Sequence, residues 1–361
     1  MRIGIVTQPL EMNYGGILQN WALQQVLKRL GHEPITIDAF QRYAGLHIVY
    51  RNIANFCQWV VRWRCKGHFS LHLPYCGAVR QEFTGAFIED HIIKTRPIWD
   101  YERSLIDDYT LDALIVGSDQ VWRRNFCESH LTDMYLDFAK GLPVKRVAYA
   151  ASFGVDEWNY NPEQTEACAR LLQQFDAVSV REESGVGLCR EYLGVNAQCV
   201  LDPTLLLKAE DYEEIVDKEH EAGEPYLAVY CLDKTPVKVD FFNRLAQERG
   251  LVVRYFSTGW SAKLSVGQWM AIFKNASMVV TDSFHGTVFS ILFGKEFYTL
   301  CNPNRGNSRM LNLLSKLGLE NHMLSDTEPV EPAQRDIDWT VVHERLDNLR
   351  RESLDFLKSS F

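Results

Sequence analysis

A histidine separates two segments of different periodicity in the stretch 278–293, MVVTDSFHGTVFSILF. Residues 278–281 form a short apolar run that suits a buried strand, and residues 286–293 are almost wholly apolar, as in a buried helix. His285 therefore falls in the turn, at the carboxyl edge of a sheet, where free N–H groups and a helix start favour an anion. We interpret His285 as an active-site residue; a helix-capping or satisfied core histidine is the alternative.

The residues around this histidine support the active-site interpretation. A polar cluster lies between the two apolar segments and consists of Thr281, Asp282, Ser283 and His285. The packing of two such apolar segments does not require polar side chains, which favours a functional role for them. Gly286 follows directly, and because it has no Cβ it lets a ligand approach the backbone.

Two arginines follow the next predicted strand, residues 296–300. A right-handed crossover makes this strand parallel to the first, so the loop after it opens on the edge that carries His285. The loop, CNPNRGNSRM, brings Arg305, Ser308 and Arg309 towards the histidine, and Arg309 opens a further helix. Guanidiniums and a helix start are what a phosphate or carboxylate site requires. Solvated loop arginines are the alternative.

The amino-terminal part predicts a strand-helix-strand unit, with strands at 2–7 and 34–38 and a helix at 17–30. Gly15 and Gly16 precede that helix at a carboxyl edge. The pair lacks the G-x-G-x-x-G spacing of a dinucleotide site, so a structural turn and a ligand loop are equally supported.

Three further predicted strands, 113–116, 147–151 and 177–180, each end in polar residues that a common edge would collect. The first is followed by Asp119, Gln120 and Trp122, a combination that suits a sugar; a helix cap is the alternative for Asp119. The second is followed by Ser152 and Phe153. The third is followed by Arg181, which we interpret as an anion holder or as the partner of a nearby glutamate.

Composition narrows the function classes. The 361-residue chain is 46% hydrophobic and 24% charged, typical of a globular protein of about two α/β domains. A net charge of −9 argues against a nucleic-acid binder. We expect a cytoplasmic protein, because there is no run of about 18 apolar residues, no apolar signal region at the start, and nine scattered cysteines.

Residues 41–102 interrupt the α/β pattern with an aromatic and basic insertion, including FCQWVVRWRCKGHF. A helix here could pack on the domain, lie peripherally on the inner face of an anionic membrane, or cover the acceptor. Its Cys65, His68, His72 and Cys76 are of zinc-ligand types, but their spacing matches no standard motif, and we predict an irregular loop without metal.

The fold prediction is α/β, with two Rossmann-like domains facing across a cleft. We divide the chain into domains 1–205 and 206–336 and a C-terminal helix, 337–361, that crosses back over both. The second domain alternates strands at 226–232 and 251–256 with helices at 239–249 and 266–274 before it reaches His285.

Six segments in chain order resemble the polysaccharide pyruvyl transferase family: NYGGILQNWALQ, LIVGSDQVW, YAASFG, SVREESG, VLDPTLLL and TDSFHG. The resemblance covers most of the chain and implies a GT-B-like fold. It implies a transferase that moves the pyruvyl group of phosphoenolpyruvate, a co-substrate, onto a sugar of a polysaccharide precursor as a cyclic ketal, with no cofactor. The sugar would be nucleotide- or lipid-linked.

The resemblance also implies roles for the residues. His285 is the catalytic candidate, as acid, base or phosphate-holding cation. The donor residues, in the second domain and at the end of the first, are Arg181, Ser283, Phe284, Gly286, Arg305, Ser308 and Arg309. The acceptor residues, in the first domain, are Asn13, Gly15, Gly16, Gln19, Asp119, Gln120, Trp122, Ser152 and Phe153.

One position departs from the family pattern. Relatives often carry an arginine two residues before the histidine, where this chain has Ser283. The departure removes a charge from the donor site, which Arg305 or Arg309 could replace. It leaves two other hypotheses open: a glycosyltransferase that uses a nucleotide sugar, and a catalytically silent sugar-binding member of a polysaccharide assembly complex.

Overall fold

The computed structural model describes residues 1–40, 82–127, 130–218, 223–257, 264–331 and 336–361. Most of the predicted insertion lies outside these ranges. The helix proposed for FCQWVVRWRCKGHF and the four residues Cys65, His68, His72 and Cys76 are therefore outside the described residues.

The N-terminal domain is built on a sheet of six parallel strands in the order β2-β1-β3-β4-β5-β6. The strands are β1 Arg2–Val6, β2 Glu33–Thr36, β3 Ala113–Val116, β4 Lys145–Ala151, β5 Ala177–Val180 and β6 Gln198–Cys199. β3 is buried along its whole length, as its four apolar residues predict. Because all six strands are parallel, their carboxyl ends meet at one edge.

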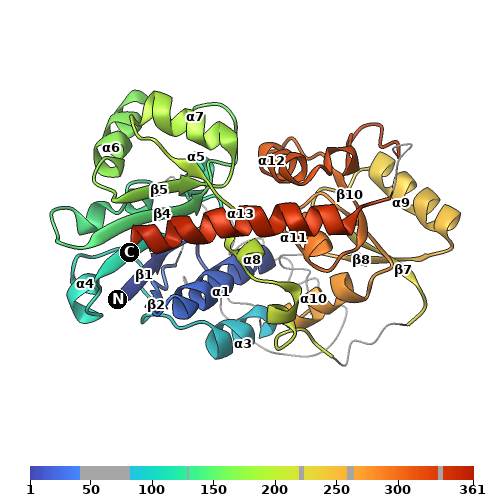
Figure 1. The fold of residues 1–361 in the computed structure, drawn as a ribbon, viewed down its shortest axis with the longest axis horizontal. Coiled ribbons are helices and arrows are strands. Elements are labelled where there is room, and N and C mark those ends of the chain that lie inside the picture. The colour runs from blue at the N-terminus through green and yellow to red at the C-terminus, as the bar shows by residue number, and fades with distance from the viewer. Residues whose placement is uncertain (41–81, 128–129, 219–222, 258–263, 332–335) are drawn as a thin grey trace, which may run out of the picture.

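Helices cover both faces of this sheet (Figure 1). They are α1 Tyr14–Arg29, α3 Glu82–His91, α4 Ser104–Asp108, α5 Arg124–Cys127, α6 Pro162–Leu172, α7 Glu183–Tyr192 and α8 Pro203–Leu206, with 3₁₀ turns at Asp133–Tyr135, Asp137–Ala139 and Ala209–Tyr212. α1 begins three residues earlier than the predicted 17, so Gly15 and Gly16 lie in its first turn rather than in a loop.

The C-terminal domain has a second parallel sheet of five strands in the order β11-β10-β9-β7-β8. Its strands are β7 Tyr226–Tyr230, β8 Val252–Phe256, β9 Met278–Thr281, β10 Glu296–Leu300 and β11 Met323–Leu324. Its helices are α9 Pro236–Arg249, α10 Val266–Asn275, α11 Phe284–Leu292 and α12 Ser308–Leu317, with a 3₁₀ turn at Glu320–His322. β9 and β10 pair directly, so the loops after them open on one edge, as predicted.

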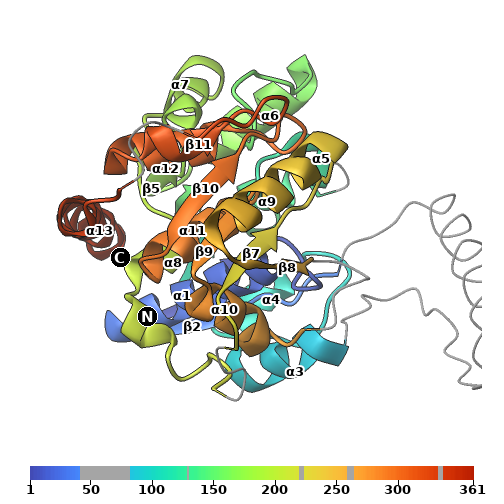
Figure 2. The same cartoon turned by 90° about the vertical axis from the view of Figure 1, so that its right-hand side faces the viewer.

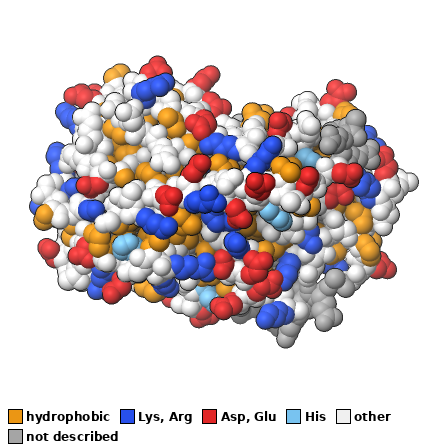
Figure 3. Space-filling model, viewed as in Figure 1, with side chains coloured by type: hydrophobic (Ala, Val, Ile, Leu, Met, Phe, Trp, Pro, Cys, Tyr) orange, Lys and Arg blue, Asp and Glu red, His pale blue; other side chains and the backbone are white. Residues whose placement is uncertain are grey.

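The last helix, α13 Trp339–Ser360, runs across both domains (Figures 1 and 2). Arg350 donates from Nε to the carbonyl of Leu205 at 2.8 Å, and Ser353 Oγ accepts from the Leu201 N–H at 3.0 Å. On the face that this helix crosses, basic and acidic side chains are interspersed (Figure 3). Within the described ranges, no helix has the length and apolar character to cross a membrane.

The two domains share one apolar core. A single buried cluster includes Leu18 of α1, Phe289 of α11 and Leu357 of α13. Tyr14 stacks on Trp269 of α10, with ring centroids 5.3 Å apart and an interplanar angle of 18°. This shared core holds the two sheet edges against each other, and the residues that follow the strands of both sheets therefore meet.

Candidate active site between the two domains

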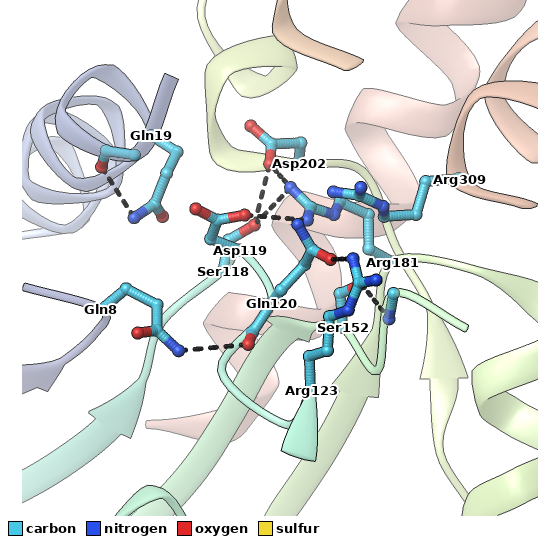
Figure 4. Close-up of polar contacts among 12 residues, drawn as sticks. Gln8, Gln19, Ser118, Asp119, Gln120, Arg123, Ser152, Arg181, Asp202 and Arg309 are labelled. Carbon is cyan, nitrogen blue, oxygen red and sulfur yellow. Dashed lines mark hydrogen bonds and ion pairs between the residues drawn. The ribbon is translucent and has the colours of Figure 1, made fainter. Parts of the chain in front are cut away.

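Five strands deliver charged or hydrogen-bonding side chains to the interface between the domains. Asp119 follows β3, Arg181 follows β5, Asp202 follows β6, His285 follows β9 and Arg309 follows β10. Figure 4 shows Asp119, Arg181 and Asp202 converging, with Arg309 beside Arg181. Arg181 and Arg309 come together at this interface, as predicted. His285 is not among the described residues that line their shared pocket, so the prediction of a single pocket that holds the histidine as well is wrong. The histidine is instead buried beside Asp202.

Asp202 is the centre of this group. It is 1% exposed and accepts from Arg181 Nη1 at 2.6 Å, from Ser118 Oγ at 2.8 Å and from the Thr204 N–H at 3.0 Å. Burial by itself would raise the pKa of Asp202, but His285, Arg181 and Thr204 together lower it below its ordinary value. Asp202 is therefore a carboxylate, held rigidly in the interior.

His285 is the second residue of α11, not a turn residue as predicted, because Ser283 already caps the helix. The imidazole is buried, and its Nε2 lies 3.8 Å from Asp202 Oδ2. Within the described part of the chain this nitrogen has no hydrogen-bond partner. Its ring contacts Phe284 edge-on and abuts Gly15, where an added Cβ would collide with it. Gly15 is required for close approach of α1 to the histidine.

Arg181 is fixed by two carboxylates. Besides its bond to Asp202, it forms a longer ion pair with Asp119 at 3.4 Å, and its guanidinium lies over the Phe284 ring at 4.6 Å. Burial by itself would lower the pKa of Arg181, but the nearby carboxylates of Asp202, Asp119 and Glu182 more than compensate and raise it. Arg181 is a permanent cation whose Nε–H has no partner among the residues that the structure describes.

Arg309 lies beside Arg181 with fewer partners. It is 6% exposed and donates from Nη2 to the carbonyl of Arg305 at 3.0 Å, and its buried Nε has no partner in the described ranges. Its guanidinium lies 5.6 Å from the Phe284 ring centroid. Burial, and then the charge of Arg181, lower the pKa of Arg309 to about 10. A buried guanidinium with an unpaired N–H is a strong donor available to an anion.

A small cavity opens at these two guanidiniums. Arg181, Arg309, Phe284, Asp202 and Lys316 are among the residues that line it. His285 does not line it but touches two of the lining residues, Asp202 and Phe284. Lys316 pairs with Glu183 at 2.7 Å, and Arg181 pairs with Asp202 and Asp119, so among the described residues Arg309 is the lining cation without an ion pair. Its guanidinium makes the cavity suitable for a small anion.

Ser152 and Glu182 form a buried hydrogen bond next to Arg181. Glu182 Oε1 accepts from Ser152 Oγ at 2.9 Å and from the Phe153 N–H at 3.0 Å. Burial raises the pKa of Glu182, while Arg181 and Arg309 act in the opposite direction. The Ser152 hydroxyl, predicted to contact the acceptor, is used inside the protein to hold this loop.

The loop after β3 and the start of α1 form the acceptor side. Asp119 adopts a left-handed conformation with φ of 78°, unusual for a residue other than glycine. Its Oδ2 accepts from exposed Asn13 Nδ2 at 3.2 Å, and Gly16 packs against both side chains. Gln19 is buried and donates to Thr7 Oγ1 at 3.1 Å. Asn13 and Asp119 are thus brought together, whereas Gln19 serves the interior.

Trp122 and Phe153 do not face a ligand, and the prediction that they contact the acceptor is wrong. Trp122 is fully buried, stacks on Tyr135 with centroids 5.0 Å apart, and donates from Nε1 to the Met134 carbonyl at 3.0 Å. Phe153 is 2% exposed and packs against Trp122. The sequence does not distinguish an aromatic residue after a strand that faces a ligand from one that packs in the core.

Trp122→Ala is therefore expected to impair folding rather than acceptor binding. The substitution leaves a large cavity and an unpaired carbonyl, and the unfolding free energy should fall by about 3–5 kcal/mol. Chemical denaturation measures this fall. Trp122→Phe should lose clearly less, because it keeps most of the ring stacking on Tyr135; equal losses in the two variants would contradict a packing role.

Gly286 and Ser283 also act on the protein itself. A Cβ at Gly286 would collide with Thr281 Oγ1, so the glycine permits close packing of α11 on β9 rather than access for a ligand. Ser283 caps α11. Its side chain accepts from the Gly286 N–H at 3.5 Å, so the hydroxyl does not replace the arginine charge seen in relatives. Ser308 begins α12, and its buried hydroxyl has no hydrogen-bond partner among the described residues.

Arg305 lies at the surface, away from the cavity. It forms an ion pair with Asp233 at 2.8 Å, and its side chain is 46% exposed. Its carbonyl accepts from Arg123 Nη1 at 3.3 Å, so the loop after β10 contacts the segment after β3. Arg123 also donates to Gln120 Oε1 at 2.6 Å (Figure 4). The Arg305 side chain thus binds Asp233 rather than the cavity, which corrects its predicted donor role.

Arg305→Ala is expected to have a small effect. An exposed ion pair contributes up to about 1 kcal/mol, so thermal unfolding should change little. Any activity that depends on the cavity should fall less than about fivefold, because the carbonyl of residue 305, which Arg123 and Arg309 use, remains. A loss comparable to that of Arg309→Met would show that Arg305 binds the donor.

Sequence reasoning missed three residues of this site: Asp202, Ser118 and Lys316. Asp202 directly precedes the proline at the start of α8, a pattern that reads as a helix cap and boundary. The available signal was its position after the last strand of the first sheet, at the edge that carries Asp119 and Arg181.

Solved structures with the same fold support the GT-B-like architecture. A provisionally assigned UDP-N-acetylglucosamine 2-epimerase from Listeria monocytogenes aligns with a TM-score of 0.54 and 11% identity over 99% of this chain and 90% of that chain. The S. aureus MnaA-UDP co-structure aligns with a TM-score of 0.51 and 10% identity over 99% and 90%. At these identities the likeness shows the fold alone. No curated protein matches the chain in sequence.

A family match covers residues 13–302, from Asn13 beside Asp119 to the loop after β10. It spans all of the strands that deliver the residues described above. The chain belongs to the polysaccharide pyruvyl transferase family.

Proposed function

We propose that the protein transfers the pyruvyl group of phosphoenolpyruvate to two hydroxyls of a sugar in a polysaccharide precursor, giving a cyclic ketal and inorganic phosphate. The observation that carries the donor assignment is the pair Arg181 and Arg309, buried side by side in one cavity, each with an N–H that has no partner among the described residues. Phosphoenolpyruvate has two anionic groups, a phosphate and a carboxylate, and each would accept charge-assisted hydrogen bonds from a guanidinium.

The reaction needs proton transfer at carbon and at oxygen. Protonation of the methylene carbon makes the adjacent carbon electrophilic, and a sugar hydroxyl adds to it as its proton is removed. Phosphate then leaves with the electrons of the carbon–oxygen bond, and the second hydroxyl closes the ketal on the same carbon. The sum is one phosphoenolpyruvate and one diol converted to one ketal and one phosphate.

His285 would serve these proton transfers. An imidazole, with an ordinary pKa of about 6.5, can give and take protons at neutral pH. Asp202, held by Arg181 and Ser118, lies 3.8 Å from Nε2 and would orient and stabilise the protonated ring. Because His285 is buried behind Phe284 and Asp202, we infer that a shift of the Phe284 side chain accompanies binding.

The acceptor would enter from the N-terminal domain. Asp119 and Asn13 offer a carboxylate and an amide to a sugar hydroxyl, and Gln120 lies next to them. A carrier on the sugar, nucleotide or lipid, would extend away from the domain interface.

The test is incubation of the full chain with phosphoenolpyruvate and a panel of free, nucleotide-linked and lipid-linked sugars. We expect phosphate release together with a sugar product heavier by one pyruvate less one water. Calorimetry with phosphoenolpyruvate alone should show binding that Arg309→Met weakens. If UDP-sugars are consumed while phosphoenolpyruvate neither binds nor reacts, the protein is instead a nucleotide-sugar glycosyltransferase.

A further inference from the structure

Arg123 belongs to the N-terminal domain but forms hydrogen bonds with both domains. Its Nη2 donates to the Asn304 carbonyl at 3.0 Å, and its Nη1 donates to the Arg305 carbonyl at 3.3 Å and to Gln120 Oε1 at 2.6 Å. Asn304 and Arg305 lie in the β10–α12 loop, residues 301–307 of the C-terminal domain, whereas Gln120 follows β3. One guanidinium therefore connects the loop that precedes Arg309 to the acceptor side of the site.

The charge of Arg123 is not explained by a carboxylate. The three hydrogen bonds that it makes to described residues all end on neutral oxygens. Burial lowers the pKa of Arg123, and the nearby charge of Arg305 acts in the same direction. A neutral amide could bond one or two of these oxygens without a partly buried charge. A guanidinium adds several N–H donors in one rigid plane, which can hold three oxygens at defined positions.

On the donor side, Arg123 holds the carbonyl that positions Arg309. The Arg305 carbonyl accepts from Arg309 Nη2 at 3.0 Å as well as from Arg123. Among the described residues this carbonyl is the hydrogen-bond partner of the Arg309 guanidinium, whose Nε has none there. The direction of the free Nε–H therefore depends on where the Arg305 carbonyl lies, and on packing against Phe284.

Two glycines allow the β10–α12 loop to approach the N-terminal domain closely. Gly306 has a φ of 83°, and a Cβ added there would collide with the Gly154 carbonyl oxygen. Gly154 has a φ of 66°, and a Cβ added there would collide with Gln120 Oε1, the atom that Arg123 contacts. A residue with a side chain would be strained at both positions and would push the loop away from Arg123.

Arg123 is itself anchored on the N-terminal domain. Gln120 Oε1 holds the guanidinium, and the Gln120 carbonyl in turn accepts from Gln8 Nε2 at 3.1 Å (Figure 4). The guanidinium also lies over the Phe126 ring at 4.7 Å. Because the anchor belongs to one domain and the carbonyls to the other, Arg123 can set the position of the β10–α12 loop.

We propose that Arg123 is a positioning residue for the donor site. Anchored by Gln120, it fixes the Arg305 carbonyl across the domain interface, and that carbonyl holds the Arg309 guanidinium in the direction that meets the donor anion. The inference rests on the proposed function in calling this anion the donor; the link between Arg123 and the β10–α12 loop stands by itself.

The first test needs no ligand. Hydrogen exchange measured by mass spectrometry compares the full-length wild type with Arg123→Met, which keeps a long side chain but has no donors. We expect the peptide 302–311 to exchange about tenfold faster in the variant. The reason is that the Arg305 N–H, which donates to the Asn302 carbonyl at 3.0 Å, lies in the turn that Arg123 holds.

Arg124→Met is the matched control. Arg124 is the neighbouring arginine, but it donates to the Asn159 carbonyl of its own domain at 3.2 Å, so exchange over 302–311 should equal that of wild type. Helix α11 reports general loosening. If Arg123→Met accelerates exchange in α11 as much as in 302–311, Arg123 is an ordinary stability residue. Unchanged exchange in 302–311 would show that Arg123 does not hold the loop. Either result overturns the proposal.

Substitutions of Gln120 test the anchor in the same assay. Gln120→Glu keeps an oxygen for Arg123, so exchange over 302–311 should not rise above that of wild type. Gln120→Met removes the acceptor and should accelerate exchange by about two- to fivefold, less than Arg123→Met, because the bonds to the loop carbonyls remain possible. Equal exchange in the two Gln120 variants would contradict the anchoring role.

The second test measures anion binding by calorimetry with phosphoenolpyruvate. Arg123→Met should bind it about three- to tenfold more weakly than wild type, and Arg124→Met should bind it as wild type does. Arg123→Lys should recover part of the loss, because an ammonium donates to carbonyls but cannot hold three oxygens in one plane. A loss of the same size in the Lys and Met variants would contradict positioning through these hydrogen bonds.

The outcomes separate this inference from the proposed function. Faster exchange over 302–311 in Arg123→Met, with no binding of phosphoenolpyruvate to wild type, would support the link across the domains and reject the donor assignment. Binding of phosphoenolpyruvate that Arg309→Met weakens and Arg123→Met leaves unchanged would support the donor assignment and reject the positioning role.

Discussion

His285→Ala is expected to abolish pyruvyl transfer while the protein stays folded. A positioned general acid or base contributes about 10²–10⁴-fold to a rate. The described residues that line the interface cavity include no histidine, and His285 is the histidine that contacts two of them, Asp202 and Phe284. The loss should fall on kcat, because Asn13 and Asp119 on the acceptor side and Arg181 and Arg309 on the donor side are untouched. Phosphate release under saturating phosphoenolpyruvate measures it.

The control for this variant is His343→Ala. His343 is exposed on α13, so its removal tests whether the loss of any histidine matters. Calorimetry should show that His285→Ala binds the acceptor nearly as wild type does. Retention of more than about a tenth of wild-type turnover would reject a proton-transfer role for His285 and favour a sugar-binding protein without catalysis.

Arg309→Met and Arg181→Met are expected to separate donor binding from stability. Arg181 neutralises Asp202 and Asp119 in the interior, and its removal leaves buried carboxylates unpaired, so the unfolding free energy should fall by about 3–5 kcal/mol. Arg309 makes one hydrogen bond to a carbonyl and has a pKa lowered by burial, so Arg309→Met should change the unfolding free energy by less than about 1 kcal/mol.

Arg309→Met, which should leave the unfolding free energy almost unchanged, should clearly weaken the binding of phosphoenolpyruvate. Loss of the Arg309 charge removes a charge-assisted hydrogen bond to phosphoenolpyruvate, worth about 1.5–3 kcal/mol, or roughly 10–150-fold in affinity. Methionine keeps the apolar packing over Phe284, so the change isolates the charge. Urea denaturation and calorimetry with phosphoenolpyruvate measure the two effects. Destabilisation by Arg309→Met as large as by Arg181→Met, with donor affinity unchanged, would make Arg309 a structural residue.

The elements of the fold follow largely from local sequence. Predicted strands at 113–116, 177–180, 278–281 and 296–300 have the observed bounds, because short apolar runs bounded by polar residues and glycine read directly as buried strands. The alternation of such strands with amphipathic helices predicted parallel sheets. That in turn placed Arg181, His285 and Arg309 at carboxyl edges, and the six sequence motifs by themselves indicated the family.

Helix starts were less predictable than strands. α1 begins at Tyr14 and α11 at Phe284, earlier than their glycines indicated, because packing tolerates glycine where a close neighbour requires it. Gly15 therefore allows the His285 ring to contact α1, and Gly286 allows α11 to pack on β9. Neither glycine lies in a ligand loop. Such contacts join residues distant in the chain and leave no periodic signal.

The sequence by itself determined which residues reach the two sheet edges, because strand ends depend on local periodicity. The tertiary structure decided which way each side chain faces: Trp122 inward to the core, Arg305 outward to Asp233, and Arg309 and Asp202 towards Arg181. These choices depend on how the domains pack through α13 and the shared core, and hence on contacts between residues more than 100 positions apart. Burial then set the charge state and the unpaired N–H groups that make the cavity an anion site.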